Sequence, residues 1–188
     1  MSHSVGMQLF CAAVGNRVSE ISSLLKDHPE IDVNWTDSTR WTALHFACRK
    51  GHVEIVKLLL AHPKIDVNLR SSNGDTPLSF GCWSGRVSVV RLLLEDPRVD
   101  VKLKDNSGRT QLQLAAYNDE LEVMEWLIAS GRDLGTSRTR KGNTGNTAQS
   151  SQPKKLQMDQ RGKLCRCWKG SFPTQHRLVM KFVCGLEC

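Results

Sequence analysis

The sequence contains no run of about 18 consecutive apolar residues, which is the length that a membrane-spanning helix needs. No Lys or Arg precedes the apolar segment at residues 7–15, whereas a secretory signal begins with basic residues. The last four residues, 185–188, do not begin with the Cys that prenylation requires. We therefore expect no membrane span, no export signal and no lipid anchor.

Recognisable catalytic motifs are missing as well. The sequence has no Gly-rich phosphate loop, no His-Glu-x-x-His and no Gly-x-Ser-x-Gly motif. The seven Cys are an odd number, and Cys11, Cys48 and Cys82 lie in apolar helical stretches, where a reduced thiol behaves as a small hydrophobe. We expect an intracellular, cytoplasmic protein, with the nucleus as the alternative, that has no enzymatic activity, cofactor or metal.

Acidic residues are scarce after residue 135. Residues 136–188 hold eleven Lys and Arg but only two acids, whereas residues 1–135 hold 15 basic and 17 acidic residues. The formal net charge of +7 therefore belongs to the tail. Residues 142–152 are small and polar, which is typical of a linker, so we expect residues 136–188 to form a basic, mostly disordered tail.

The function of the tail has several interpretations. Its basic residues around Trp168 and Phe172 would attract the phosphates of a nucleic acid, although a solvated tail with non-specific affinity is favoured. The C-x-C spacing of Cys165 and Cys167 argues against a zinc site, because zinc knuckles separate paired ligands by two to four residues. The abrupt change in composition also fits misread or alternatively spliced coding sequence.

A repeat of 34 residues organises the first 135 residues. Asp-Val-Asn at residues 32–34 recurs at 66–68 and, as Asp-Val-Lys, at 100–102. Thr-x-Leu segments and Leu-rich segments follow in the same register in each unit. In each unit this pattern predicts a turn, a short helix that begins with Thr, a break at Gly and a longer helix that ends near Pro. Because such a unit cannot bury its apolar face alone, neighbouring units must stack.

Residues 42–47, Thr-Ala-Leu-His-Phe-Ala, closely follow the signature T-P-L-H-x-A, and two further units follow it more loosely. Residues 7–135 therefore resemble the ankyrin repeat family. The resemblance implies an all-α solenoid of helix-turn-helix units with short β-turn or hairpin connections, in which His45 hydrogen-bonds to neighbouring turns. The predicted domains are a partial unit at 1–31, in which residues 12–13 match 46–47, full units at 32–65, 66–99 and 100–135, and the tail at 136–188.

Several residues depart from the repeat pattern. Asp119 takes an inter-helix position that is Gly in the two preceding units, and Arg40 takes a loop position that is Gly in the two following units, so strain is expected at a left-handed backbone. No recognisable unit follows residue 135. We expect the outer face near Leu121, Val123 and Leu127 to be poorly covered, unless the tail covers it or the chain is a fragment of a longer repeat protein.

The resemblance also implies a binding surface. Stacked units form a concave face from their first helices and turn tips, and in this family its variable positions carry partner specificity. Trp, Tyr and Arg dominate interface hot spots. We expect a monomeric, non-catalytic protein–protein interaction scaffold for an unidentified protein partner, with nucleic-acid association through the tail as the alternative. The predicted contact residues are Trp41, Arg49, Lys50, Asp75, Trp83, Arg109 and Tyr117.

Four of the five Trp residues lie in the repeats. Trp41 and Trp83 fall on the predicted binding face, with folding onto a neighbouring repeat as the alternative for each. Trp35 and Trp126 align with Leu positions of the other units, so we expect both to be core residues.

Overall fold

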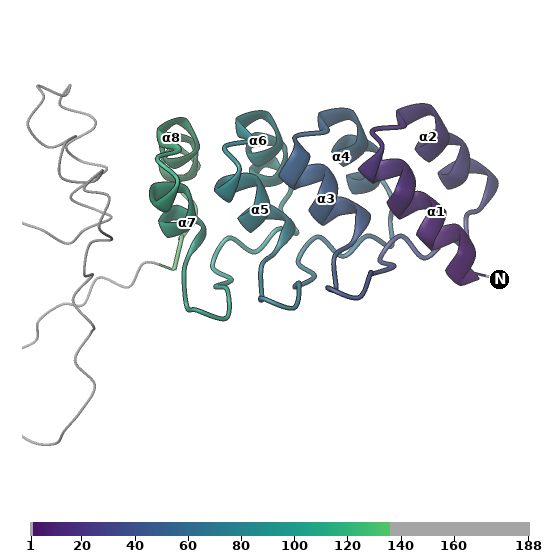
Figure 1. Ribbon diagram of the computed structural model, residues 1–188. Coiled ribbons are helices and arrows are strands. Elements are labelled where there is room, and N and C mark those ends of the chain that lie inside the picture. The colour runs from purple at the N-terminus through teal and green to yellow at the C-terminus, as the bar shows by residue number, and fades with distance from the viewer. Residues whose placement is uncertain (1, 136–188) are drawn as a thin grey trace, which may run out of the picture. The chain divides into compact units, whose positions relative to one another are not determined.

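A computed structural model describes residues 2–135 of the chain, which form eight helices and no strand. The helices form four pairs in a row, and the loops between successive pairs project together from one side (Figure 1). The first helices of the pairs are α1 (Ser2–Val14), α3 (Ala43–Lys50), α5 (Pro77–Trp83) and α7 (Gln111–Tyr117). The second helices are α2 (Val18–Asp27), α4 (Val53–Leu60), α6 (Val87–Glu95) and α8 (Leu121–Ala129).

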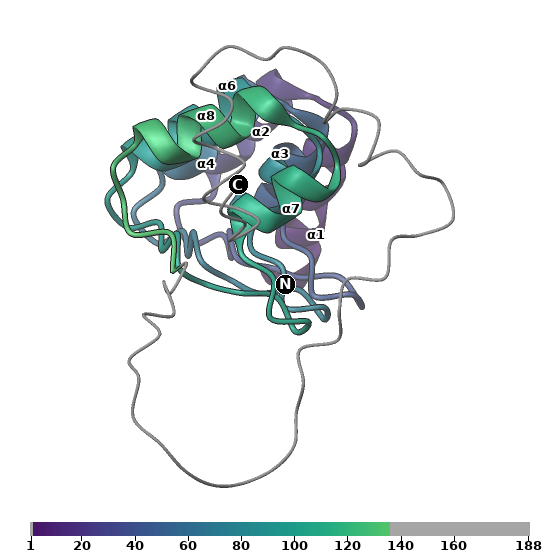
Figure 2. The ribbon, with the colours of Figure 1, turned by 90° about the vertical axis from the view of Figure 1, so that its left-hand side faces the viewer.

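The helices form two layers. The first helices pack on one another along the row, and the second helices pack on one another beside them. Figure 2, which looks along the row from the α7/α8 end, shows both layers. The predicted all-α solenoid of stacked helix-turn-helix units is therefore confirmed for the described residues. The predictions for the tail, residues 136–188, lie outside the part of the chain that the structure describes.

The apolar core runs continuously through the row, between the two layers. The last three pairs contribute equivalent side chains that are fully or almost fully buried, which are Leu44, Ile55 and Leu59, then Leu78, Val89 and Leu93, then Leu112, Val123 and Leu127. In each second helix the two named residues lie four apart, and a buried residue three positions before the Leu (Val56, Val90 or Met124) completes one apolar face. Each pair therefore covers part of its neighbour's apolar surface.

A capping box starts the first helix of every full unit. The hydroxyl of Thr42 accepts a hydrogen bond from the backbone N–H of His45, and the backbone N–H of Thr42 donates in return to Nδ1 of His45 at 3.0 Å. Ser79 and Gln113 close the same box on Thr76 and Thr110. Three different side chains thus satisfy one requirement, the unpaired N–H groups at a helix start.

His45 also ties its unit to the next one. Since Nδ1 accepts a hydrogen bond from Thr42, the ring proton lies on Nε2, which is 3.0 Å from the carbonyl oxygen of Leu69 and 3.3 Å from that of Asp75. The side chain is fully buried. Burial lowers the pKa of His45 to about 4, against the weaker opposing effect of the two carbonyls. The imidazole is therefore neutral near pH 7 and serves a structural purpose.

The recurring Asp-Val-Asn motif has a direct structural explanation. The amide of Asn34 donates to the carbonyl oxygen of Lys64 at 2.8 Å and accepts from the backbone N–H of Asp66 at 2.9 Å. Asn68 makes the same pair of bonds to the following unit, at 2.8 Å each. In the third unit, Lys102 replaces Asn and forms an ion pair of 2.9 Å with Asp133. The Asn residues therefore hold successive loops at a fixed spacing.

The backbone adopts the predicted left-handed conformation at Arg40 and Asp119, each with a φ of 60°. The glycines equivalent to Arg40 take the same region, with a φ of 80° at Gly74 and 76° at Gly108, as do those equivalent to Asp119, with 83° at Gly51 and 65° at Gly85. A side chain at such a φ costs free energy that Gly avoids. The left-handed backbone expected at both positions is confirmed.

The register of the first unit differs from the sequence prediction by one residue. Asn16, with a φ of 55°, takes the inter-helix position of Gly51. Arg17 donates its backbone N–H to Ala12 as His52 does to Ala47, at 2.9 Å in both cases. The match of residues 12–13 to 46–47 is therefore wrong, and residues 12–13 match 47–48. The cause is α2, which has ten residues where α4 has eight.

The outer face of α8 is partly exposed, as expected, but of the three predicted residues only Leu121 takes part in it. Val123 and Leu127 are fully buried, whereas Leu121 and Ile128 are 43% and 39% exposed. Their equivalents in α4 and α6 are half-buried, because another helix pair follows there. The core assignment of Trp126 is wrong, since this side chain is 37% exposed. The guanidinium carbon of Arg91 lies over its indole ring, 4.3 Å from the ring centroid.

Replacing Asp119 by Gly is expected to stabilise the repeat domain by about 1 kcal/mol, because Gly adopts the left-handed backbone without strain. Chemical denaturation measures the change. Gly51→Ala should have the opposite effect and destabilise the repeat domain, because a Cβ there would lie 2.9 Å from Cδ of Arg86. An Asp119→Gly variant no more stable than the parent would contradict the strain.

The stability of the domain should depend on pH through His45. The folded state prefers the neutral ring, so this contribution is complete above about pH 6.5 and is lost as the pH falls towards 4, by roughly 3 kcal/mol in total. His45→Gln is the matched control, because Gln113 shows that Gln can close the same capping box. Denaturation of both proteins from pH 7 to 4 isolates the effect, since the remaining carboxylates cancel in the difference. A difference in stability that stays constant over this range would disprove it.

Candidate functional site

Large side chains gather where the first helices end. Arg49, Trp83 and Tyr117 lie at equivalent positions of α3, α5 and α7, and Trp41 lies just before the Thr42 cap of α3. We call these four residues the aromatic–arginine column. Because successive first helices pack side by side, the column runs across three adjacent repeats. It lies on the side of the row that the first helices form.

Arg49 is held between two aromatic rings. Its guanidinium carbon lies 5.1 Å from the centroid of Trp41 and 5.7 Å from that of Trp83. The first ring precedes its own helix, and the second belongs to the next repeat. A cation near aromatic faces is attracted by their quadrupoles. The contact therefore fixes the long Arg49 side chain, which would otherwise sample many rotamers.

The aromatic residues of the column differ in exposure. Trp41 is half-buried, and its ring centroid lies 4.5 Å from that of Phe80 and 5.9 Å from that of Phe46. Trp41 thus folds onto the neighbouring repeat, the alternative raised from the sequence. Trp83 and Tyr117 remain 42% and 72% exposed. The column therefore has an anchored end at Trp41 and an open end at Tyr117.

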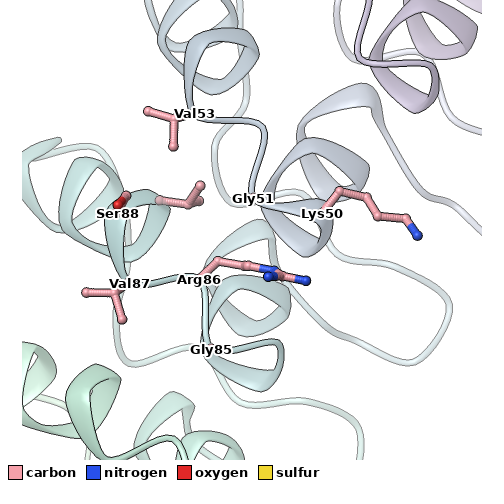
Figure 3. A pocket seen from close by; sticks show the side chains of 8 residues that line it. Lys50, Gly51, Val53, Gly85, Arg86, Val87 and Ser88 are labelled. Atoms are coloured by element: carbon pink, nitrogen blue, oxygen red, sulfur yellow. The ribbon is translucent and has the colours of Figure 1, made fainter.

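Lys50 extends the cationic part of the column. Its Nζ lies 5.9 Å from the ring centroid of Phe46, and the residue is exposed. It also lines a pocket of about 300 Å³ that Gly51, Val53 and residues 85–89 complete (Figure 3). In the pocket Arg86 lies against Gly51 and donates from Nε to the carbonyl oxygen of Arg49 at 3.2 Å. A cation of the next repeat is thereby fixed beside the column.

The structure places Asp75 and Arg109 in turns. Arg109 donates from Nε to Asp105 at 2.6 Å, and Asp105 is almost fully buried. The carboxyl of Asp75 is half-buried; burial first and the charge of Asp105 second raise its pKa, against the effect of Arg109. The charges of both predicted residues therefore act on neighbouring loop residues, and Arg109 is already paired with Asp105.

Sequence reasoning missed two members of the surface. Val14 is 41% exposed and takes the position of Arg49 in the first unit once the register is corrected. Arg86, which lies against Gly51 beside the column, was not among the predicted contact residues. The position of Val14 could have been found from Asn16, because Asn tolerates the left-handed backbone of the inter-helix break.

Other kinds of site find little support among the described residues. No helix there is long and apolar enough to cross a membrane. Residues 2–135 hold no group of three or more His, Cys, Asp or Glu placed to bind a metal ion. The zinc and nucleic-acid interpretations of the tail concern residues 136–188 and fall outside the described range.

Comparison with protein families identifies the repeats. The model for ankyrin repeats (3 copies) matches residues 9–105 and 67–138, which together cover more than half of the chain. No curated protein is similar enough to the chain to count as a match. Ankyrin repeats are generally protein–protein interaction modules, and the fold is typically non-enzymatic. The stacked helix pairs, the capping boxes and the family match agree, and the chain belongs to the ankyrin repeat family.

Proposed function

We propose that this protein is a non-catalytic scaffold that binds a protein partner through the aromatic–arginine column on its concave face. The observation that carries the proposal is the arrangement of Arg49 between Trp41 and Trp83, beside the open ring of Tyr117. Trp, Tyr and Arg are the residue types in which interface hot spots are enriched. Here they form one continuous group across adjacent repeats.

The rigidity of the column supports a binding role. Ordering long side chains at an interface costs roughly 0.5–1.5 kcal/mol for each one immobilised. The rings already hold Arg49, and Trp41 packs on Phe80, so these two side chains are ordered before a partner binds. Trp83 and Tyr117 add large side chains with few rotatable bonds. A partner would therefore meet a surface with little left to order.

The reactive side chains within the repeats serve the core, which favours a non-catalytic role. Cys48 and Cys82 are fully buried free thiols, and burial raises the pKa of both, so neither forms a thiolate at neutral pH. His45 is neutral and both of its ring nitrogens are engaged. Two reduced thiols in the core are also typical of a reducing compartment, which supports an intracellular, cytoplasmic location. We expect the scaffold to act as a monomer.

The double variant Trp83→Ala plus Tyr117→Ala should lose the partner while the fold remains, because both side chains project from helix ends outside the core. Hot-spot truncations of at least 2 kcal/mol correspond to a roughly 30-fold loss of affinity. Quantitative mass spectrometry after affinity capture from cell extract measures the loss.

Trp126→Ala is the matched control. It removes an aromatic of similar exposure from α8, in the other helix layer. A folded double variant that captures the same proteins as the parent at the same abundance would refute the choice of face. Loss of partners in the Trp126→Ala control instead would place the binding surface on the second helices.

A further inference from the structure

We propose that the partner presents an acidic, linear segment, with a carboxylate seated on Arg49 and Lys50 and a neighbouring apolar side chain on Trp83 and Tyr117. This inference rests on the proposed function, since it specifies what the aromatic–arginine column recognises. It follows from the hydrogen-bonding state of Arg49, from the charges along the column and from the exposed rings.

The guanidinium of Arg49 is fixed in position, yet its donors are uncommitted. Within residues 2–135 its side chain contacts the Trp41 and Trp83 rings and has no hydrogen-bonded or ion-paired partner. Arg70, Arg98 and Arg109, in contrast, each donate to a carbonyl or carboxylate oxygen. A guanidinium presents a planar fork of N–H donors that matches a carboxylate in two parallel hydrogen bonds. Arg49 is therefore oriented by its faces, while its edge remains open to an acceptor.

The charges along the column change sign from one end to the other. Lys50 and Arg86 lie beside Arg49, and in the first two full repeats no acid occupies the equivalent positions at the first-helix ends. Burial lowers the pKa of His52, and the positive charges of Lys50 and Arg86 lower it further. Acids enter at the third repeat, with Asp119 and Glu120 after Tyr117. The Glu120 carboxylate lies against Gly85, at the first-helix end of the second full repeat. A complementary partner therefore carries its negative charge opposite Arg49 and Lys50 of the first full repeat.

The rings determine what lies next to the carboxylate. Trp83 contacts Arg49 with its face and remains 42% exposed, and Tyr117 follows on the adjacent repeat with 72% exposure. Covering these rings with an apolar side chain removes apolar surface from water. It also shields the Arg49–carboxylate pair, and a charge pair that loses solvent is stronger than an exposed one. One acidic and one apolar residue, close in sequence, would satisfy both requirements.

A nucleic acid fits these observations less well. Its phosphates carry a negative charge on every nucleotide, and binding strength grows with the number of phosphates neutralised. The cations form one group at the start of the column, and Asp119 and Glu120 follow Tyr117 along it. A strand stacked on Trp83 and Tyr117 would bring its backbone towards these carboxylates. A peptide with a local acid avoids that repulsion.

Selection from displayed random peptides of about 12 residues on the full chain tests the inference. We expect the selected peptides to be enriched in Asp or Glu next to an aromatic or aliphatic residue. Synthetic copies of the tightest binders should bind Arg49→Gln plus Lys50→Gln at least about tenfold more weakly than the parent, because a charge-assisted, bidentate pair is lost. Arg49→Lys, which keeps the charge but not the fork, should bind with intermediate affinity.

Two controls separate this site from general charge effects. Lys26→Gln plus Lys57→Gln removes the same charge from α2 and α4, and should leave the affinity unchanged. Both double variants keep all the basic residues of the tail, so any tail contribution cancels.

Selected peptides without acids that still require Trp83 and Tyr117 would overturn the inference and leave the proposed function intact. Peptides indifferent to Trp83→Ala plus Tyr117→Ala would contradict the proposed function itself. Tighter binding of a labelled single-stranded oligonucleotide that also requires Arg49 and Lys50 would overturn the inference in favour of nucleic acid.

Discussion

A pair of short helices cannot cover its own apolar surface, and in this protein each pair is completed by the next one along the chain. The stacking must keep a constant spacing, since the loops, caps and core residues of the three full units repeat every 34 residues. Polar side chains set that spacing by bonding to the backbone of the following unit, as Asn34 and the buried His45 do. Where no further pair follows in the described residues, Leu121 and Ile128 become exposed.

The same spacing creates the binding surface. Equivalent positions of adjacent repeats lie side by side, so residues 34 apart in sequence meet as neighbours. Arg49 of one unit therefore reaches the Trp83 ring of the next, and Trp41 packs on Phe80 across the same boundary. The core restricts the buried positions to a few apolar residues, whereas the helix ends are free to vary. A rigid scaffold thus presents a group of side chains that no single repeat could hold in place.

Much of the fold could be predicted from the sequence, because each backbone requirement selects particular residues. Thr caps the first helix of each full unit, and the left-handed positions at Arg40 and Asp119 could be inferred from the Gly residues at equivalent sites. The contacts of the site could not, since they depend on rotamers across repeat boundaries. The sequence indicates that Trp41 and Arg49 share a face, but not that Trp41 turns onto Phe80 and leaves Arg49 between two rings. Trp126 was misassigned because the aligned residues Leu58 and Leu92 are themselves only half-buried, so the position lies outside the core.

The central claim is that binding occurs on the first-helix face, at the aromatic–arginine column. Hydrogen–deuterium exchange of the full chain, with and without a bound selected peptide, tests it most directly, because backbone amides report protection along the entire chain. The account predicts slower exchange at the ends of α3, α5 and α7 and little change in α4, α6 and α8. Protection confined to the second helices, or to residues 136–188, would contradict it.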